Sequence, residues 1–279
     1  MVEKIGKRES ITAKLKYMKQ SNNTVLITGG GTGIGLALAE IFLHKGNEVI
    51  ICGRTRTTLD KAQKKFPLLH TIVADVSCKE GRKVLSTEIA YHFPKLNVLV
   101  NNAGIYSITD ILDPEYIPTL ESQLATNLVA PMALIQELML VLEKHADATI
   151  VNVTTGYVFI PSAQSSSYSA SKTALRAITQ GLRFTLQKKS IRVVEVIPPA
   201  VDTQMNKGKK ISLMTSERFA QKAFKGLVNG QDEIVIGMSK LGKLLSRIAP
   251  KFGFKKMNTN EEKQRLEMLL AEVDSHSKV

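Results

Sequence analysis

Short apolar runs with the length of β-strands alternate along this chain with longer segments of helical periodicity, and turn residues separate them. The runs expected to form strands are Thr24 to Thr28, Glu48 to Cys52, Leu69 to Ala74, Val98 to Val100, Thr149 to Val153, Ile191 to Ile197 and Glu233 to Ile236. The helices expected between them cover about residues 33–45, 57–65 and 79–92, a long segment ending near Lys144, and residues 167–188. This alternation predicts βαβ units, which close into a parallel sheet with helices on both faces.

The length of 279 residues favours one α/β domain rather than two. We expect a basic N-terminal extension over residues 1–21 and a folded domain over residues 22–237, which includes a substrate-loop segment at 203–230. A helical and basic C-terminal segment with a tail, residues 238–279, is expected to decorate this domain.

The net charge of +13 is concentrated in two segments of the chain. Residues 1–23 carry +4 and residues 204–260 carry +9, whereas residues 24–203 carry only +2. A nucleic-acid-binding domain would carry its basic residues on one face of the folded core, so the charge pattern argues against this function class. A peripheral binder of anionic membranes through residues 204–260 stays open as an alternative, although contact with a membrane is not the favoured expectation.

Cysteine and histidine spacing argues against disulfide and metal sites. Cys52 and Cys78 form no paired motif, and the five histidines lack ligand spacing. No uninterrupted apolar run approaches the roughly 18 residues that span a bilayer, and the first 23 residues lack a signal-peptide core. We therefore expect a cytoplasmic protein without a metal.

A glycine-rich turn follows the first expected strand. The run Thr28-Gly29-Gly30-Gly31-Thr32-Gly33-Ile34-Gly35 leads directly into an apolar-periodic helix. Glycines here allow a tight turn and the approach of a pyrophosphate to the helix N-terminus, although a bare tight turn would look similar. No Lys-Ser/Thr pair follows, so dinucleotide binding is favoured over phosphoryl transfer. The predicted fold class is a Rossmann-type, doubly wound parallel sheet in three αβα layers.

The residue after the second expected strand bears on the choice of cofactor. An NAD-binding fold normally places an acid there, but this chain has Gly53-Arg54-Thr55-Arg56. A guanidinium at this place can hold a 2′-phosphate, so Arg54 favours NADP(H) over NAD(H), with Arg56 as a second contact. The alternative is that both arginines are solvated loop charges.

Tyr168 and Lys172 stand four residues apart and so share one helical face. A phenol has a pKa of about 10, and a cation about 4 Å away supplies enough free energy to lower that value by about three units. Lys172 is therefore predicted to lower the pKa of Tyr168 for acid–base work. The alternative is an ordinary amphipathic helix with a surface lysine. The run Ser165 to Ser167 is expected to cap this helix.

Together these motifs resemble the short-chain dehydrogenase/reductase family over about residues 22–237. The resemblance implies that Tyr168 is a general acid/base, that Lys172 anchors a ribose, and that Asn127 braces a water in a proton relay. The residues expected to contact the cofactor are Gly29, Gly33, Ile34, Gly35, Arg54, Asp75, Val76, Asn102, Ala103, Gly104, Lys172 and Thr203.

Two positions depart from the family pattern. Thr155 stands where the family has a substrate-polarising serine, and it keeps a hydroxyl for this catalytic role, whereas Thr154 should point the other way. Pro199 stands where the family usually has glycine. The run Pro198 to Thr203, together with Ser246 to Pro250, resembles the DltE-like oxidoreductases of this family, whose substrate does not follow from the sequence.

The function implied is hydride transfer between NADP(H) and a carbonyl or secondary alcohol of a small, hydrophobic substrate. The alternatives are a dinucleotide sensor or scaffold without turnover, and an NAD-preferring dehydrogenase. A homodimer or homotetramer is implied by the family. The residues expected around the substrate are Tyr106, Ile108, Phe159, Ile160 and Met205, and the segment Ser239 to Met257 is predicted to form a mobile flap over it.

Overall fold

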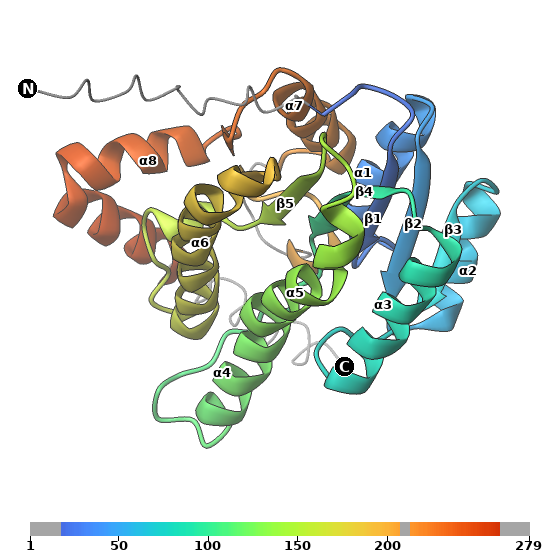
Figure 1. Ribbon diagram of the computed structural model, residues 1–279. Helices are drawn as coiled ribbons and strands as arrows, with labels where there is room; N and C mark the ends of the chain where they lie inside the picture. The colour runs from blue at the N-terminus through green and yellow to red at the C-terminus, as the bar shows by residue number, and fades with distance from the viewer. Residues whose placement is uncertain (1–17, 207–212, 263–279) are drawn as a thin grey trace, which may run out of the picture.

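The computed structural model describes residues 18–206 and 213–262, which fold around one parallel sheet with the strand order β3-β2-β1-β4-β5-β6-β7 (Figure 1). The strands are β1 (Thr24–Thr28), β2 (Glu48–Gly53), β3 (His70–Val73), β4 (Leu96–Asn101), β5 (Thr149–Val153), β6 (Arg192–Ile197) and β7 (Glu233–Val235). The helices are α1 (Gly33–His44), α2 (Arg56–Lys65), α3 (Lys79–His92), α4 (Tyr116–Leu124), α5 (Ala130–Leu142), α6 (Ser166–Leu186), α7 (Ser216–Val228) and α8 (Ser239–Ile248). Residues 250–262 are helical as well.

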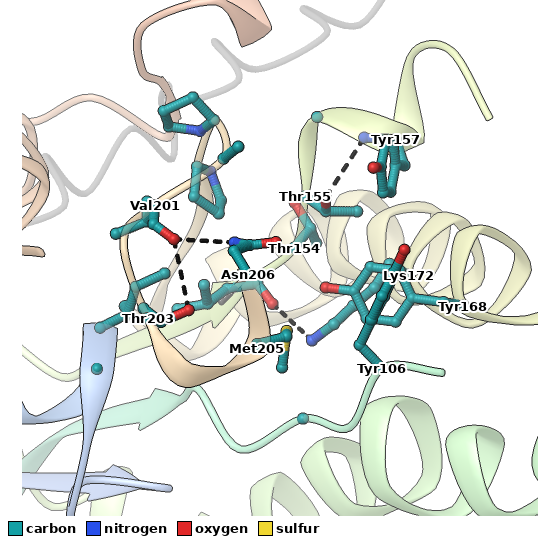
Figure 2. Close-up of a pocket in the computed structure, with 18 of the residues that line it drawn as sticks. Tyr106, Thr154, Thr155, Tyr157, Tyr168, Lys172, Val201, Thr203, Met205 and Asn206 are labelled. Carbon is teal, nitrogen blue, oxygen red and sulfur yellow. Dashed lines mark hydrogen bonds between the residues drawn. The ribbon is translucent and has the colours of Figure 1, made fainter. Parts of the chain in front are cut away.

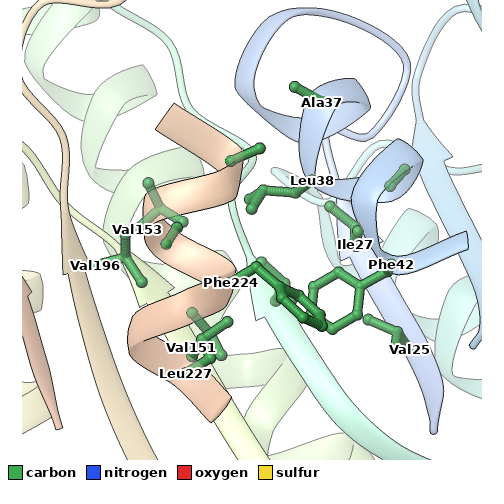
Figure 3. Close-up of a cluster of buried hydrophobic side chains, with 14 of the residues drawn as sticks. Val25, Ile27, Ala37, Leu38, Phe42, Val151, Val153, Val196, Phe224 and Leu227 are labelled. Carbon is green, nitrogen blue, oxygen red and sulfur yellow. The ribbon is translucent and has the colours of Figure 1, made fainter. Parts of the chain in front are cut away.

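Two hydrophobic cores lie on the two faces of the sheet, because successive strand side chains point to opposite faces. Val25 and Ile27 belong to the core that packs under α1, α2 and α7. Leu26 belongs to the other core, under α3, α5 and the end of α6. Phe42 of α1 and Phe224 of α7 meet edge to face with ring centroids 5.2 Å apart (Figure 3). The predicted doubly wound, three-layer fold is confirmed.

The strand order reverses between β1 and β4. The chain runs outward from β1 to β3 and then returns to the other side of β1 with β4. In such sheets ligands bind beyond the carboxyl ends of the strands at this reversal. The expected location of a site is therefore the loops that follow β1 and β4.

A π-helical turn, η1 (Ala125–Val129), joins α4 to α5. By length and composition alone the helix Tyr116–Leu142 is long and apolar enough to cross a membrane, a feature that a search for uninterrupted apolar runs does not show. Leu134 and Leu138 of this helix are buried in the core against the sheet. We therefore assign this helix to the helical layer that packs on one face of the sheet.

The folded domain begins earlier in the chain than residue 22. Met18 is buried in the core under α1, and the carbonyl oxygen of Gln20 accepts a hydrogen bond from the Asn47 side chain at 3.1 Å. Residues 18–21, predicted as part of the basic extension, thus pack with the domain. The remainder of that extension, part of the substrate loop and the tail lie outside the described residues.

Candidate active site

The turn between β1 and α1 uses backbone conformations that favour glycine. Gly29 and Gly33 have φ angles of +64° and +52°. A Cβ atom on Gly35 would lie 2.2 Å from the carbonyl oxygen of Gly29, so the helix packs directly on the turn. The first N–H groups of α1 have no partners within the helix, and its first turn carries no acidic residue. The turn therefore fits an anionic group such as a pyrophosphate.

Thr28, which was not predicted from the sequence, joins the ends of β1 and β4. Its hydroxyl oxygen accepts the backbone N–H groups of Asn102 and Ala103, each at 3.0 Å. The Asn102 amide in turn donates to the carbonyl oxygens of Thr28 and Gly29 at 3.0 and 3.2 Å. These bonds hold the loop after β4 against the glycine turn.

A pocket of about 420 Å³ opens beside these two loops. The predicted residues that line it are Gly29, Gly33, Ile34, Gly35, Asn102, Ala103, Gly104, Thr155, Tyr168, Lys172 and Thr203. Figure 2 shows Thr155, Tyr168 and Lys172 on one side of the pocket and the segment Val201–Asn206 on the other. The structure thus brings most of the predicted site residues together.

Arg54, Asp75 and Val76 lie outside this pocket. Arg54 is exposed directly after β2, and the N–H of Gly30 donates to the carbonyl oxygen of Cys52 at 3.2 Å, which holds the end of β2 beside the glycine turn. The Asp75 carboxylate accepts the N–H and hydroxyl of Ser77 at 2.9 and 2.6 Å, and the hydroxyl bond is the main cause that lowers its pKa. These three residues therefore border the neighbouring strand ends, further along the same edge of the sheet.

Asn127 lies in the π-helical turn and is fully buried. Its side-chain amide donates to the carbonyl oxygen of Ile105 at 3.0 Å and to the Ser171 hydroxyl at 3.1 Å, while its oxygen accepts the N–H of Ile105 at 2.9 Å. Both amide hydrogens are therefore used within the protein, and the role of Asn127 in bracing a water stays a prediction. The observed contacts fix the segment after Gly104 against α6.

Tyr168 and Lys172 are both buried on the first turns of α6. The Lys172 ammonium donates to the carbonyl oxygen of Val153 at 3.0 Å. Burial raises the pKa of Tyr168 well above its usual range, and a hydrogen bond with Thr155 only partly opposes this effect. The direction is opposite to that predicted from the sequence, because desolvation of the phenolate outweighs any lowering by Lys172. Ser165 holds the predicted N-cap position, but its side chain makes no capping bond.

Thr154 and Thr155 at the end of β5 point to opposite sides, as predicted. Both residues border the pocket, and the Thr155 hydroxyl accepts the N–H of Tyr157 at 3.4 Å and also hydrogen-bonds Tyr168. The Thr154 hydroxyl donates instead to the buried carboxylate of Glu195 at 2.8 Å. Only the Thr155 hydroxyl is therefore placed beside the Tyr168 phenol.

A chain of ionic contacts runs behind this wall of the pocket. Arg176, one helical turn after Lys172, pairs with Glu195 and also with Glu233 at 2.9 Å. Glu233 pairs in turn with Lys243 of α8. Burial raises the pKa of Glu195, whereas the Arg176 guanidinium opposes that shift. These contacts tie α6, β6, β7 and α8 together around the pocket.

Two further aromatic rings pack against the Tyr168 ring. Tyr106 and Tyr157 meet it edge to face, with ring centroids 5.0 and 6.3 Å away. Ile160 and Met205 line the pocket as predicted, but Ile108 and Phe159 do not. Ile108 is exposed to solvent, and the Arg176 guanidinium lies 4.8 Å from the Phe159 ring centroid.

Residues of α8 and of the helical segment after it close the pocket. Met238, Ser239, Gly242 and Met257 are part of its lining. Glu261 accepts the Tyr157 hydroxyl at 2.8 Å and the Ser162 hydroxyl at 2.6 Å. The predicted placement of this segment over the pocket is therefore observed, while its mobility stays a prediction. No sequence pattern pointed to Glu261, which lies about a hundred residues from its partners.

Comparison with known proteins settles the family. The family model for short chain dehydrogenases matches residues 23–212, which is more than half of the chain. The chain belongs to the short-chain dehydrogenase family. The uncharacterized oxidoreductase DltE of Bacillus subtilis is 40% identical over 224 residues, which cover 78% of this chain and 89% of DltE. The resemblance inferred from the motifs is confirmed.

Two solved structures share the fold of this short-chain dehydrogenase. A short chain dehydrogenase from Burkholderia cenocepacia J2315 in complex with NADP has a TM-score of 0.74 at 21% identity, with 84% of this chain and 97% of that chain covered. A short-chain dehydrogenase from Sphingobium yanoikuyae in complex with NADPH has a TM-score of 0.69 at 22% identity, with 76% and 87% covered. At these identities the likeness concerns the fold.

The buried Lys172 ammonium should make the fold less stable at neutral pH. Burial lowers its pKa from 10.5 to about 8, which costs about 3 kcal/mol at roughly 1.36 kcal/mol per pKa unit. Between pH 8 and 10.5 the unfolded chain binds this proton more strongly than the folded one, so stability due to this group rises with pH. We expect Lys172→Met to be more stable than wild type at neutral pH.

Urea unfolding of both proteins at a series of pH values tests this expectation. The advantage of Lys172→Met should be largest below pH 8 and should shrink as the pH rises toward 10.5. The lost bond to Val153 reduces the advantage without removing its pH dependence. A variant that is less stable than wild type by the same amount at every pH would contradict the assignment.

Proposed function

We propose that this chain is an NADP(H)-dependent oxidoreductase that interconverts a carbonyl group and a secondary alcohol of a small, hydrophobic substrate. The observation that carries the proposal is the convergence of Thr155, Tyr168 and Lys172 in one pocket beside the glycine turn. A proton donor and acceptor, a second hydroxyl and a cation are the groups that such a reaction requires around the reacting oxygen.

The pocket fits a nicotinamide dinucleotide. The glycine turn and the N-terminus of α1 would hold its pyrophosphate, and Arg54 and Arg56 would meet a 2′-phosphate. A Cβ atom on Gly104 would lie 3.1 Å from the Asn127 side-chain oxygen and 3.3 Å from Lys172 Nζ. A glycine at this position therefore lets the backbone lie close to these two side chains beside the pocket. When bound, the nicotinamide supplies or accepts the hydride.

Different residues of this chain stabilise the charge on the substrate oxygen and transfer the proton. The Thr155 hydroxyl donates a hydrogen bond to the substrate oxygen as negative charge develops there, and Tyr168 transfers the proton to or from that oxygen. The Lys172 ammonium supplies a nearby positive charge and a donor for a ribose hydroxyl. Tyr106, Tyr157 and their apolar neighbours exclude water from the reacting groups.

We also propose that the protein forms a homodimer or homotetramer through α4, α5 and α6. Large apolar side chains on these helices are exposed, among them Leu140 on α5 and Phe184 on α6. Exposed large apolar residues on these helices are consistent with such an interface.

Arg54→Ala should change the choice of cofactor. A charge-assisted hydrogen bond to the 2′-phosphate contributes roughly 1.5 to 3 kcal/mol, so the variant should bind NADPH about ten- to a hundredfold more weakly and NADH nearly unchanged. Titration of each cofactor by calorimetry measures both affinities. Equal losses for NADPH and NADH would show that Arg54 has a structural role, and Arg56→Ala tests for a second contact in the same way.

The activity is tested with a panel of ketones, diketones, quinones and aldehydes. Consumption of NADPH is measured as the loss of its absorbance. Consumption that depends on both enzyme and substrate is the expected result. Thermal stabilisation by NADPH without consumption on any substrate would favour a dinucleotide sensor or scaffold. Faster turnover with NADH than with NADPH would favour an NAD-preferring dehydrogenase.

A further inference from the structure

The side of α8 that faces solvent carries large apolar side chains. The exposed fractions of Leu241, Leu244 and Ile248 are 45%, 52% and 68%, and Met238 just before the helix is 69% exposed. In the helical segment that follows, Phe252 and Phe254 are exposed by 58% and 46%. A helix on the surface of a globular protein ordinarily turns such residues toward the core. Here they face outward.

The opposite side of the same segment contacts the protein through small residues. Ser239 is buried and donates to the carbonyl oxygen of Pro198 at 2.8 Å, and Gly242 lines the pocket. A Cβ atom on Gly253 would lie 3.0 Å from the Ile160 Cδ1 atom. The packing therefore holds this segment in place while its large apolar side chains stay outside the core.

Positive charge accompanies the exposed apolar residues. Residues 234–260 contain six lysines and arginines and no acidic residue. Lys243 is paired with Glu233, whereas the other five are exposed. We define the α8 surface as the exposed apolar residues Met238, Leu241, Leu244, Ile248, Phe252 and Phe254 with the exposed basic residues Lys240, Arg247, Lys251, Lys255 and Lys256.

We propose that the α8 surface docks on an anionic lipid bilayer. Helices with an apolar face and a lysine-rich polar face lie in the plane of the membrane interface, where the apolar side chains enter the acyl region and the basic ones meet anionic headgroups. Figure 1 shows α8 and the helix after it at one end of the molecule, outside the layers that cover the central strands. This proposal concerns binding and does not depend on the proposed oxidoreductase activity.

Two other occupants fit the α8 surface less well. A second copy whose two-fold axis passed through the α8 surface would bring the same basic residues close to one another, with no acidic residue in 234–260 to pair with them. A nucleic acid would neutralise the basic residues but would leave the six apolar side chains without an apolar phase. A bilayer with anionic headgroups provides both an anionic partner for the basic residues and an apolar phase for the apolar side chains.

The sequence contains no tryptophan, so a single introduced one reports its own surroundings. Emission of the Phe252→Trp variant should shift to the blue when vesicles of phosphatidylcholine mixed with phosphatidylglycerol are added, and should not shift with phosphatidylcholine alone. Leu68→Trp is the matched control, because Leu68 is 79% exposed in the loop after α2. Its emission should stay unchanged with either vesicle.

Sedimentation of the full chain with the same vesicles gives the affinity. The double variants Leu244→Ser with Ile248→Ser, and Lys251→Glu with Lys255→Glu, should each bind the anionic vesicles at least about tenfold more weakly. Leu68→Ser with Lys64→Glu removes the same kinds of residue elsewhere and should bind like wild type. High salt should weaken binding of the wild type.

Three outcomes would overturn the proposal. One is wild-type protein that stays in the supernatant with anionic vesicles at low salt. Another is equal loss of binding in the control and the α8 variants. The third is a Phe252→Trp emission that is already blue-shifted before vesicles are added, since the α8 surface would then be covered by another part of the chain or by a second copy.

Discussion

Tyr168→Phe is expected to lower kcat for carbonyl reduction by about 10²- to 10⁴-fold, the range that general acid–base catalysis contributes. The substitution removes one hydroxyl from a buried ring that Tyr106 and Tyr157 hold in place on two sides. The ring packing should therefore survive, and with it the binding of NADPH. Steady-state kinetics and an NADPH thermal-shift titration on the same preparation separate the two effects.

Tyr116→Phe is the matched control for this variant. Tyr116 also hydrogen-bonds a residue at the start of α6, with its hydroxyl 3.0 Å from the Ser166 hydroxyl, but it does not line the pocket. Its loss should leave kcat nearly unchanged. If Tyr168→Phe kept wild-type kcat, another group would have to transfer the proton.

Thr155→Ala is expected to lower kcat by about 10²- to 10³-fold, the loss typical of one preorganised hydrogen-bond donor to a developing oxyanion. Thr155→Ser keeps the hydroxyl and should stay active. The Thr155 methyl group narrows the pocket and stiffens the side chain, so the serine variant should accept bulkier substrates. Kinetics of the three proteins on carbonyl compounds of increasing size measure both effects.

Thr154→Val serves as the control, because it should lower stability rather than kcat. The Thr154 hydroxyl donates to buried Glu195, so its removal should lower the free energy of unfolding by about 1 to 3 kcal/mol while kcat changes little. Urea unfolding and kinetics together distinguish the neighbours. A large loss of kcat in Thr154→Val with none in Thr155→Ala would reverse the assignment of the two threonines.

The parts of the fold that the sequence predicts are those set by local periodicity. Short apolar runs of strand length, helical spacing and the glycine run depend on neighbours within a few residues, and they predict the doubly wound sheet. The four-residue spacing of Tyr168 and Lys172 likewise places both on one face of α6, as observed. The position of Thr155 followed from its spacing to Tyr168 within the family pattern.

The features that the sequence does not predict arise from contacts between distant segments. The pKa of Tyr168 rises because burial penalises its anion, and burial depends on the tertiary packing of the rings around it. Glu261 reaches Tyr157 across 104 positions of sequence. The spacing of Leu244 and Ile248 predicts an amphipathic helix, but it does not say which side of that helix faces the protein.

The proposed activity requires hydride transfer to a carbonyl carbon, with Tyr168 as the proton donor. The most direct measurement uses NADPH carrying deuterium at the transferable C4 position, with a reducible carbonyl compound found in the panel, and analyses the product by mass spectrometry. Wild-type protein should give an alcohol with one deuterium bonded to carbon, and Tyr168→Phe should give almost none in the same time. NADPH binding without labelled alcohol from any compound, or equal labelling by both proteins, would contradict the account.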